Sequence, residues 1–334
     1  MNIVEFAKHL NLSVGTVSRA LNDRPEVNVR TRELVRRRAR ELGFERNAAA
    51  RRLVTGRNFL IRLVCPHHKN VLSDYYLVSL ARALESAAGS AGYGLLLRLG
   101  DAMDEIPQTD PVDGIVLVAS REMTAADVDS ITGGGRIPTV IISEPEWMQV
   151  VYASYVLIDT RPAVAEALRY LVGLGHRRIA YIGSGLLGGE QSHIRAAFPQ
   201  MLASAGVDAD PSLLVEAGLT PEEAAESTRS LLSLPDPPTA IFARTDILAL
   251  GAIRGIESAG KHVPADISVI GHDDIDFARY VTPPLTTVAI DIPNIAVTAV
   301  ESVMEMIDGQ ITPSVKPRGG HLVVRDSCAQ PPSH

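Results

Sequence analysis

The chain is organised around one ten-residue stretch, SVGTVSRALN, at residues 13–22. In an α-helix, side chains three or four residues apart share a face, and this rule groups Val17 with Ala20 and Leu21. The opposite face carries small hydrogen-bonding groups and one guanidinium, from Gly15, Ser18, Arg19 and Asn22. Such a face packs poorly in a core but can enter the major groove of DNA.

The residues before this stretch predict a partner helix. Apolar residues follow the i, i+3, i+4, i+7 spacing of a buried helix face at Ile3, Phe6, Ala7 and Leu10, and Asn2 can cap its start. Asn11 tolerates the left-handed backbone that a tight turn needs, and Ser13 is a suitable N-cap for the following helix. We therefore predict a helix-turn-helix.

A third helix is predicted from Asn28, its N-cap, to Glu41. Its inner stripe is expected to comprise Thr31, Leu34, Val35, Ala39 and Leu42. The rest of its surface is basic, with Arg30, Arg32, Arg36, Arg37 and Arg40. We interpret residues 36–40 mainly as a solvated charged face.

Charge is distributed unevenly along the 334 residues, whose formal net charge is −7. Residues 1–57 contain 13 Lys and Arg against 6 Asp and Glu, a net of +7, and the remainder carries −14. A basic headpiece on an acidic body is typical of a DNA-binding module joined to a sensor that does not itself bind DNA. The length predicts two or three domains.

After Phe59, short apolar strands alternate with helical segments. The expected strands are Leu60–Cys65, Tyr93–Arg98, Gly114–Val118, Thr139–Ile142, Tyr155–Ile158, Arg178–Ile182, Leu213–Glu216, Thr239–Ala243 and Ile267–Gly271. This alternation predicts an α/β fold with parallel sheets covered by helices on both faces.

Several runs together resemble the lactose-repressor (LacI) family of bacterial transcription regulators. They are TVSRALN at 16–22, Asn28 with Thr31-Arg32, ELGF at 41–44, LGHRRIA at 174–180, ISVIGHDD at 267–274 and TPPLTT at 282–287. The resemblance implies an all-α helix-turn-helix headpiece (1–46), a hinge helix or linker (47–57) and a two-lobed, type I periplasmic-binding-protein-like body. The N-terminal lobe would comprise 58–158 and 291–318, and the C-terminal lobe 159–290 and 319–330.

For the headpiece, the resemblance implies a DNA-binding surface. Arg19 would bond a guanine, the small Gly15 would allow close approach, and Leu53 of the hinge would wedge into the minor groove. A plain linker is the alternative for residues 47–55. The expected DNA-binding residues are Ser13, Val14, Gly15, Thr16, Ser18, Arg19, Asn22, Thr31, Asn47, Ala50 and Leu53.

For the body, ligands of open parallel sheets bind beyond the carboxyl ends of the strands. This rule selects Asp74, Asp159, Thr245, Asp246 and Asp273, whose oxygens suit a polyhydroxy ligand, and Trp147 could stack on a sugar. Asp246 could instead cap a helix, and Trp147 could only pack. The family's effector-binding arginine falls on Ile194 here, and Arg195, one residue later, is the expected effector-binding arginine. Either the helix is shifted or the ligand is recognised differently.

Three further features of the sequence could suggest a dinucleotide site, a metal site or a disulfide. GSGLLG at 183–188 matches the dinucleotide fingerprint, with Glu216 as a possible ribose partner, but it lies mid-chain behind a DNA-binding headpiece. His67-His68 lacks a second ligand cluster, so no metal site is expected. Cys65 and Cys328 form no disulfide framework and fit a reducing compartment.

Together these features predict a cytoplasmic repressor of sugar or polyol utilisation, not an enzyme, without a cofactor and without membrane association. It would bind a near-palindromic double-stranded operator as a homodimer, because the tail lacks the leucine heptads of a tetramer. A purine or nucleoside effector is the alternative within this class. An NAD-type enzyme or a solute-binding module with a vestigial headpiece is the alternative outside it.

Overall fold

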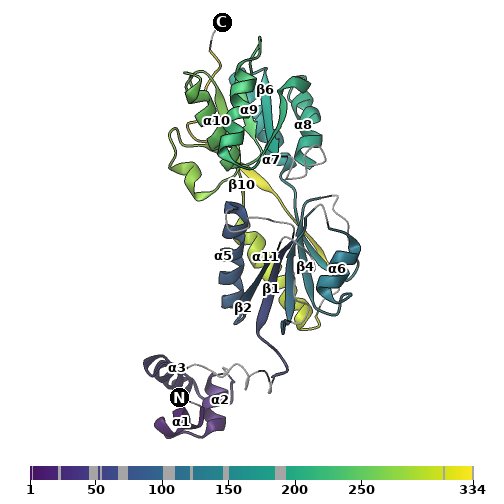
Figure 1. Cartoon of the computed structure of the whole chain (residues 1–334). Helices are drawn as coiled ribbons and strands as arrows, with labels where there is room; N and C mark the ends of the chain where they lie inside the picture. The colour runs from purple at the N-terminus through teal and green to yellow at the C-terminus, as the bar shows by residue number, and fades with distance from the viewer. Residues whose placement is uncertain are drawn as a thin grey trace. The chain divides into compact units, whose positions relative to one another are not determined.

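The computed structural model describes residues 1, 3–21, 24–44, 52, 55–66, 74–100, 110–120, 123–145, 150–184, 193–310 and 313–332. The chain divides into two compact units (Figure 1). The first unit comprises Met1–Phe59 with Pro111–Asp113, and the second comprises Leu60–Asp110 with Gly114–His334.

The first unit contains the predicted helix-turn-helix and third helix: α1 (Ile3–His9), α2 (Val14–Leu21) and α3 (Val29–Glu41). Its core is formed by Phe6, Ala7, Val17, Ala20, Val27 and Val35. The Phe6 ring stacks on Phe44 with 4.3 Å between centroids. The turn residue Asn11 has a left-handed φ of 52°, and Asn28 caps α3, as predicted.

The predicted inner stripe of α3 was too wide. Val35 is fully buried, but Leu34 and Leu42 are 36% and 44% exposed. The reason is geometric: α3 packs mainly against α2, and one neighbouring helix covers only a narrow stripe of its surface.

In the second unit, one lobe is built on a six-stranded parallel sheet in the order β11-β5-β4-β3-β1-β2. The strands are β1 (Leu60–Pro66), β2 (Gly94–Gly100), β3 (Gly114–Val118), β4 (Thr139–Ser143), β5 (Ser154–Ile158) and β11 (Val315–Arg318). Figure 1 shows α5 (Tyr75–Ser90) and α11 (Ile292–Ile307) on one face and α6 (Ala125–Thr132) on the other. Strand β11 was not predicted, because Lys316, Pro317 and Arg318 obscure any apolar pattern.

The other lobe has the sheet order β12-β10-β9-β8-β6-β7. Its strands are β6 (Ile179–Ser184), β7 (Leu214–Ala217), β8 (Ala240–Ala243), β9 (Ser268–Asp273), β10 (Thr286–Ile290) and β12 (Gly320–Val323). The final strand, β12, is antiparallel to β10, so this sheet is not entirely parallel as predicted. The chain reaches β12 from β11 of the other lobe and runs along the sheet edge in the direction opposite to β10.

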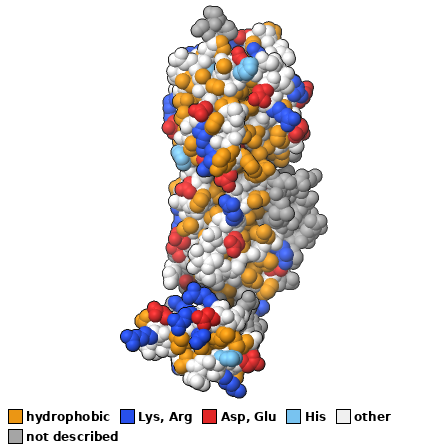
Figure 2. Space-filling model, turned by 90° about the vertical axis from the view of Figure 1, so that its left-hand side faces the viewer, with side chains coloured by type: hydrophobic (Ala, Val, Ile, Leu, Met, Phe, Trp, Pro, Cys, Tyr) orange, Lys and Arg blue, Asp and Glu red, His pale blue; other side chains and the backbone are white. Residues whose placement is uncertain are grey.

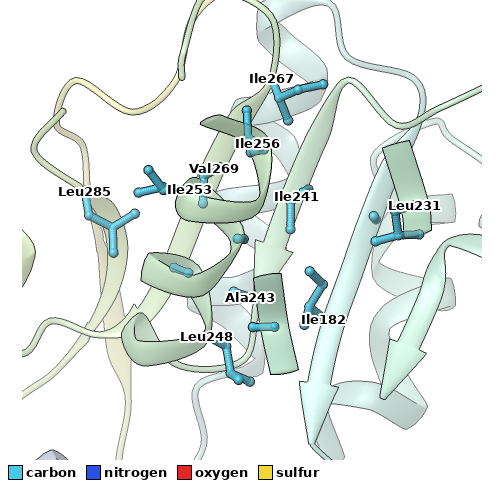
Figure 3. Packing of buried hydrophobic residues seen from close by; sticks show 14 of the residues in the cluster. Ile182, Leu231, Ile241, Ala243, Leu248, Ile253, Ile256, Ile267, Val269 and Leu285 are labelled. Atoms are coloured by element: carbon cyan, nitrogen blue, oxygen red, sulfur yellow. The ribbon is translucent and has the colours of Figure 1, made fainter. Parts of the chain in front are cut away.

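Helices cover both faces of this second sheet. On one face, α9 (Pro221–Leu232) and α10 (Asp246–Ser258) enclose a core that includes Ile182, Ile241, Leu248, Ile253 and Ile256 (Figure 3). On the other, α7 (Arg161–Leu174) and α8 (His193–Ser204) pack over Tyr181, Phe198 and Phe242. A Cβ on Gly251 of α10 would lie 2.3 Å from the Pro221 carbonyl oxygen, so this glycine allows α10 to approach α9 closely.

The chain passes between the two lobes three times, after β5, after β10 and between β11 and β12. Each connection is short, at residues 159–160, 291 and 319. The carboxyl ends of β4, β5, β8 and β9 carry the polar side chains described below. Within the described ranges, no helix combines the length and apolarity needed to span a membrane.

Candidate DNA-binding and effector sites

The N-terminus of α2 is fixed by its cap. The Ser13 hydroxyl accepts a hydrogen bond from the Thr16 backbone N–H at 3.0 Å and lies 2.8 Å from the Thr16 hydroxyl. A serine cap satisfies a backbone donor that the first helical turn leaves unpaired. Val17 and Ala20 are buried, whereas Val14, Gly15 and Arg19 are exposed on the opposite face.

Gly15 has no structural requirement within the headpiece. The position of an added Cβ would be 3.6 Å from Arg19 Nη2 and 3.8 Å from Ser13 Oγ, which is ordinary van der Waals contact. Its φ is also outside the left-handed region. Because glycine destabilises a helix relative to alanine, its presence on this exposed face is consistent with close approach of a partner.

Only some of the other predicted DNA-binding residues lie in the described part of the headpiece. Ser18 is half-buried, and the backbone N–H of Thr31 donates to the Asn28 cap at 2.8 Å. Asn22, Asn47, Ala50 and Leu53 lie outside the described residues. Figure 2 shows basic side chains gathered on the headpiece.

One ion-pair cluster joins the two lobes of the second unit. Glu144 follows β4 directly, and its Oε1 lies 3.0 Å from Nη2 of Arg244, which follows β8. The other oxygen, Oε2, lies 2.8 Å from Nδ1 of His193, the first residue of α8. The His193 side chain is 2% exposed and that of Arg244 is 12% exposed, so solvent screens the Glu144–Arg244 ion pair only weakly.

A hydrogen-bond chain runs beside this cluster. His272 Nδ1 lies 2.8 Å from Asp273 Oδ1 and 3.2 Å from Arg244 Nη1, and its Nε2 lies 2.9 Å from Thr160 Oγ1. A guanidinium has only donors, so Nδ1 accepts from Arg244 only in the tautomer that carries the imidazole proton on Nε2. The directions of the hydrogen bonds from His272 to Asp273 and to Thr160 depend on the same choice of tautomer.

Burial shifts the pKa values of both Asp273 and His272. It raises the pKa of Asp273 to about 8, against a lowering by Arg244 and together with a smaller rise from Asp74. Burial also lowers the pKa of His272 well below its usual value, and the adjacent Arg244 lowers it further. At neutral pH Asp273 is therefore mainly a carboxylic acid, able both to donate and to accept, and His272 is neutral.

Asp74 and Asp273 are brought close to the same side chain. Asp74 caps α5 and accepts from the Leu77 backbone N–H at 3.1 Å. Two residues later, the pKa of Tyr76 is raised, chiefly by burial and then by Asp273, Asp74 and Glu144. Acidic residues of both lobes thus raise the pKa of the same phenol.

Asp159 forms an ion pair with Arg161. It accepts from Arg161 Nε at 2.9 Å, Arg161 Nη2 at 2.8 Å and the Arg161 backbone N–H at 3.1 Å. These bonds lower the pKa of Asp159, mainly through the guanidinium. The carboxylate remains about one-third exposed and ionised beside the crossing at residues 159–160.

Two predicted effector residues have internal roles instead. Thr245 caps α10 by accepting from the Leu248 N–H at 3.2 Å, the role considered for Asp246. Asp246 is fully buried, and its oxygens accept from the Thr287 hydroxyl at 2.6 Å and the Ile275 N–H at 2.8 Å. Asp246 therefore joins β10 to the loop after β9 and has no exposed surface for a ligand.

The structure explains why Ile194 stands where the family has its effector-binding arginine. Ile194 is fully buried in the core between α7 and α8. Arg195 lies at the edge of that core, with its Nε 3.5 Å from Glu216 Oε1 and its Cζ 5.9 Å from the ring centroid of Tyr181, a member of the core. A guanidinium does reach the junction of the lobes, but it comes from Arg244. The predicted stacking residue Trp147 and residues 185–188 of the GSGLLG motif lie outside the described residues.

The sequence analysis missed Tyr76, Glu144, His193, Arg244 and His272. For two of them a signal was present, because Glu144 and Arg244 are each the first residue after a buried strand. The strand-end rule selected Thr245 and Asp246 and passed over Arg244. In the part of the chain that the structure describes, no group of three or more His, Cys, Asp or Glu side chains is arranged to hold a metal ion.

Comparison with known proteins supports both parts of this description. Residues 2–47 match the family described as bacterial regulatory proteins, lacI family, and residues 168–328 match the periplasmic binding protein-like domain. The chain is 30% identical to the HTH-type transcriptional repressor CytR of Escherichia coli (strain K12) over 92% of this chain and 89% of that protein. The chain belongs to the LacI family. The resemblance noted from the sequence is thereby confirmed.

Other LacI-family proteins and structures agree. The transcriptional regulator DegA of Bacillus subtilis (strain 168) is 32% identical over 86% of each chain. The structure of the regulator CelR in complex with cellobiose is 26% identical, with a TM-score of 0.71 over 98% of this chain and 99% of that one. The lac repressor dimer bound to operator and the anti-inducer ONPF is 22% identical, and its TM-score of 0.75, over 98% and 99% of the chains, shows the shared fold.

For this LacI-family chain, two predictions are therefore confirmed. The fold is the predicted combination of a helix-turn-helix headpiece with a two-lobed α/β body. The function is that of a DNA-binding transcriptional regulator, and its relatives are regulators rather than enzymes.

Proposed function

We propose that this regulator represses genes for carbohydrate or polyol use. Its affinity for DNA would fall or rise when a neutral polyhydroxy ligand binds between the lobes. The observation that carries the proposal is the polar cluster of Glu144, His193, Arg244 and Asp273, contributed by both lobes where strands end. A ligand bound there contacts both lobes, so its binding depends on their relative arrangement.

The chemistry of the cluster favours hydroxyl groups. Asp74, Glu144 and Asp159 offer carboxylate acceptors, and the guanidinium of Arg244 offers donors. An alcohol hydroxyl both donates and accepts hydrogen bonds, so it can use donors and acceptors alike. A phosphate would be repelled by the several carboxylates of the cluster. Solved structures of this fold include the regulator CelR in complex with cellobiose and a regulator from Enterococcus faecium with bound ribose.

On DNA, we propose that α2 enters the major groove. Arg19 would bond guanine O6 and N7, and Ser13, Thr16, Ser18 and Asn22 would position the helix on phosphates. Thr31 would contribute from the start of α3. Asn47, Ala50 and Leu53 would bind the minor groove.

The same proposal includes a homodimer on a near-palindromic operator. A groove of about 1240 Å³ runs along α5, α11 and residues 273–279. Large apolar side chains are exposed on these elements, at Tyr75, Val78, Phe277, Tyr280 and Val297. Figure 2 views the side of the molecule that carries α5. A second copy would cover this face, and a two-fold operator requires two headpieces.

The test uses the full-length protein and a duplex that it selects from a random-sequence pool. Thermal-shift measurements with neutral sugars and polyols, and separately with purine nucleosides, identify ligands. Binding to the selected duplex is then measured with and without each hit.

A sugar or polyol that raises the melting temperature and changes duplex affinity supports the proposal. A response confined to purine nucleosides would contradict the ligand class. Stabilisation by a sugar without any change in duplex affinity would contradict the coupling between ligand and DNA.

A further inference from the structure

A three-bond contact fixes the chain where the predicted hinge ends. Asp113 Oδ1 accepts from the Asn58 backbone N–H at 2.8 Å and from Asn58 Nδ2 at 2.9 Å. Asp113 Oδ2 accepts from the Phe59 backbone N–H at 2.7 Å. One carboxylate thus holds two consecutive residues that directly precede β1.

The backbone at this point is in an unusual conformation. Phe59 has a φ of 57°, in the left-handed region that a bulky side chain rarely adopts. Such a conformation persists only when surrounding contacts impose it. The hydrogen bond from the Phe59 N–H to a carboxylate is a contact of this kind, because bonds to charged acceptors are stronger than neutral ones.

The segment that carries Asp113 is itself anchored. Three residues earlier, Asp110 accepts from Arg98 Nε and Nη2, both at 2.8 Å. Asp110 also lies 3.7 Å from Nη1 of Arg62, a fully buried side chain of β1. Pro111 restricts the backbone between the two carboxylates. Residues 110–113 therefore form a short strut with an anchored carboxylate at each end.

We propose that Asp113 is a positioning residue for DNA recognition: it holds residues 58 and 59 in one conformation and thereby sets how the hinge leaves the body. The inference rests on the proposed function, in which residues 47–57 must meet the minor groove in register with α2. Loss of the contact should affect selective binding more than binding to random DNA, since the latter depends mainly on charge.

The experiment compares full-length native protein with Asp113→Ala and Asp113→Asn. Asp208→Asn, an exposed aspartate of the other lobe, is the matched control. Affinity is measured at one salt concentration for the duplex selected by the native protein and for a random duplex of equal length. Melting temperature and oligomeric state are measured for each variant.

For Asp113→Ala, we expect about a tenfold loss on the selected duplex, the factor typical of losing hydrogen bonds to a charged acceptor. Binding to the random duplex should change less than about twofold, because the headpiece charge is retained. Asp113→Asn keeps one carbonyl acceptor and should show an intermediate loss. Asp208→Asn should match the native protein.

Three outcomes would overturn the inference. One is native affinity of Asp113→Ala for the selected duplex. The second is an equal loss on selected and random duplexes. The third is a loss only in variants that also melt earlier or change oligomeric state, which would indicate a general folding role. If the native protein selects no duplex at all, the proposed function fails first and this inference fails with it.

Discussion

The carboxylate of Glu144 lies 3.0 Å from the guanidinium of Arg244, although the two residues are 100 positions apart in the chain. They stand at the ends of β4 and β8, strands of different sheets. Glu144 also lies 2.8 Å from His193. One carboxylate of the first lobe therefore contacts a guanidinium and an imidazole of the second. This arrangement links the two lobes.

Replacing Glu144 with Gln should destabilise the body. The substitution leaves the largely buried Arg244 without its charged partner, which should lower the free energy of unfolding by about 1–3 kcal/mol. Urea unfolding provides the measurement, with Glu257→Gln, an exposed residue of α10, as the control. Equal stability of the two variants would show that the interlobe pair contributes nothing net.

Replacing Asp273 with Asn should change how stability depends on pH. The pKa of Asp273 is raised in the folded state from 3.8 to about 8, so the unfolded chain loses this proton at a lower pH than the folded chain does. The native protein should therefore lose stability relative to Asp273→Asn as the pH rises from 4 to 8, by at most about 4 kcal/mol at neutral pH.

The asparagine is a conservative probe at this position. Its amide can donate to His272 Nδ1 as the protonated acid does, and asparagine tolerates the positive φ of 111° better than most residues. Stability is measured by urea unfolding at several pH values, with Asp208→Asn as the control. A difference between native and variant that is constant from pH 5 to pH 8 would contradict the assigned protonation.

Replacing Arg19 with Ala should reduce sequence discrimination. Loss of a bidentate guanine contact should cost about 1–3 kcal/mol on the selected duplex and flatten the preference at one base pair. Arg254→Ala, in an exposed part of α10, is the control with the same charge change. Equal losses on selected and random duplexes would reassign Arg19 to phosphate contact.

Replacing Gly15 with Ala separates folding from recognition. Nothing in the headpiece opposes a Cβ at this position, so the substitution should stabilise α2 by about 0.5–1 kcal/mol. If α2 lies close to DNA, the same methyl group should weaken binding to the selected duplex. Gly173→Ala, on an exposed part of α7 with open space around it, should stabilise the body without changing DNA binding. Unchanged or tighter DNA binding by Gly15→Ala would place the groove contact elsewhere.

Replacing Val297 with Arg should disrupt the proposed homodimer. This side chain of α11 is 46% exposed on the apolar face beside α5, and a buried unpaired charge is unfavourable in an interface. Sedimentation should show a shift toward monomer and reduced cooperative binding to a two-fold duplex. Val151→Arg, at a 93% exposed site, should leave the assembly unchanged. A native-like dimer for Val297→Arg would exclude this face.

Much of the headpiece was predictable because its structure depends on nearby residues. The helical spacing of Phe6, Val17 and Val35, the left-handed turn at Asn11 and the cap at Asn28 all follow from local preferences. Most strand positions were also predictable, since buried parallel strands are short apolar runs. Strand β11 was not predicted, because pairing with β5 rather than its own composition holds it in the sheet.

The sequence by itself determined the family, the basic headpiece with its exposed α2 face, and the alternation that builds two α/β lobes. Only the tertiary structure decided which polar side chains meet: Glu144 with Arg244, His272 with Thr160, and Asp246 with Thr287. It also decided that Asp273 holds a proton and that Asp246 is enclosed. The physical reason is that helix and strand patterns arise from residues close in sequence, whereas ion pairing and desolvation depend on distant segments that folding brings together.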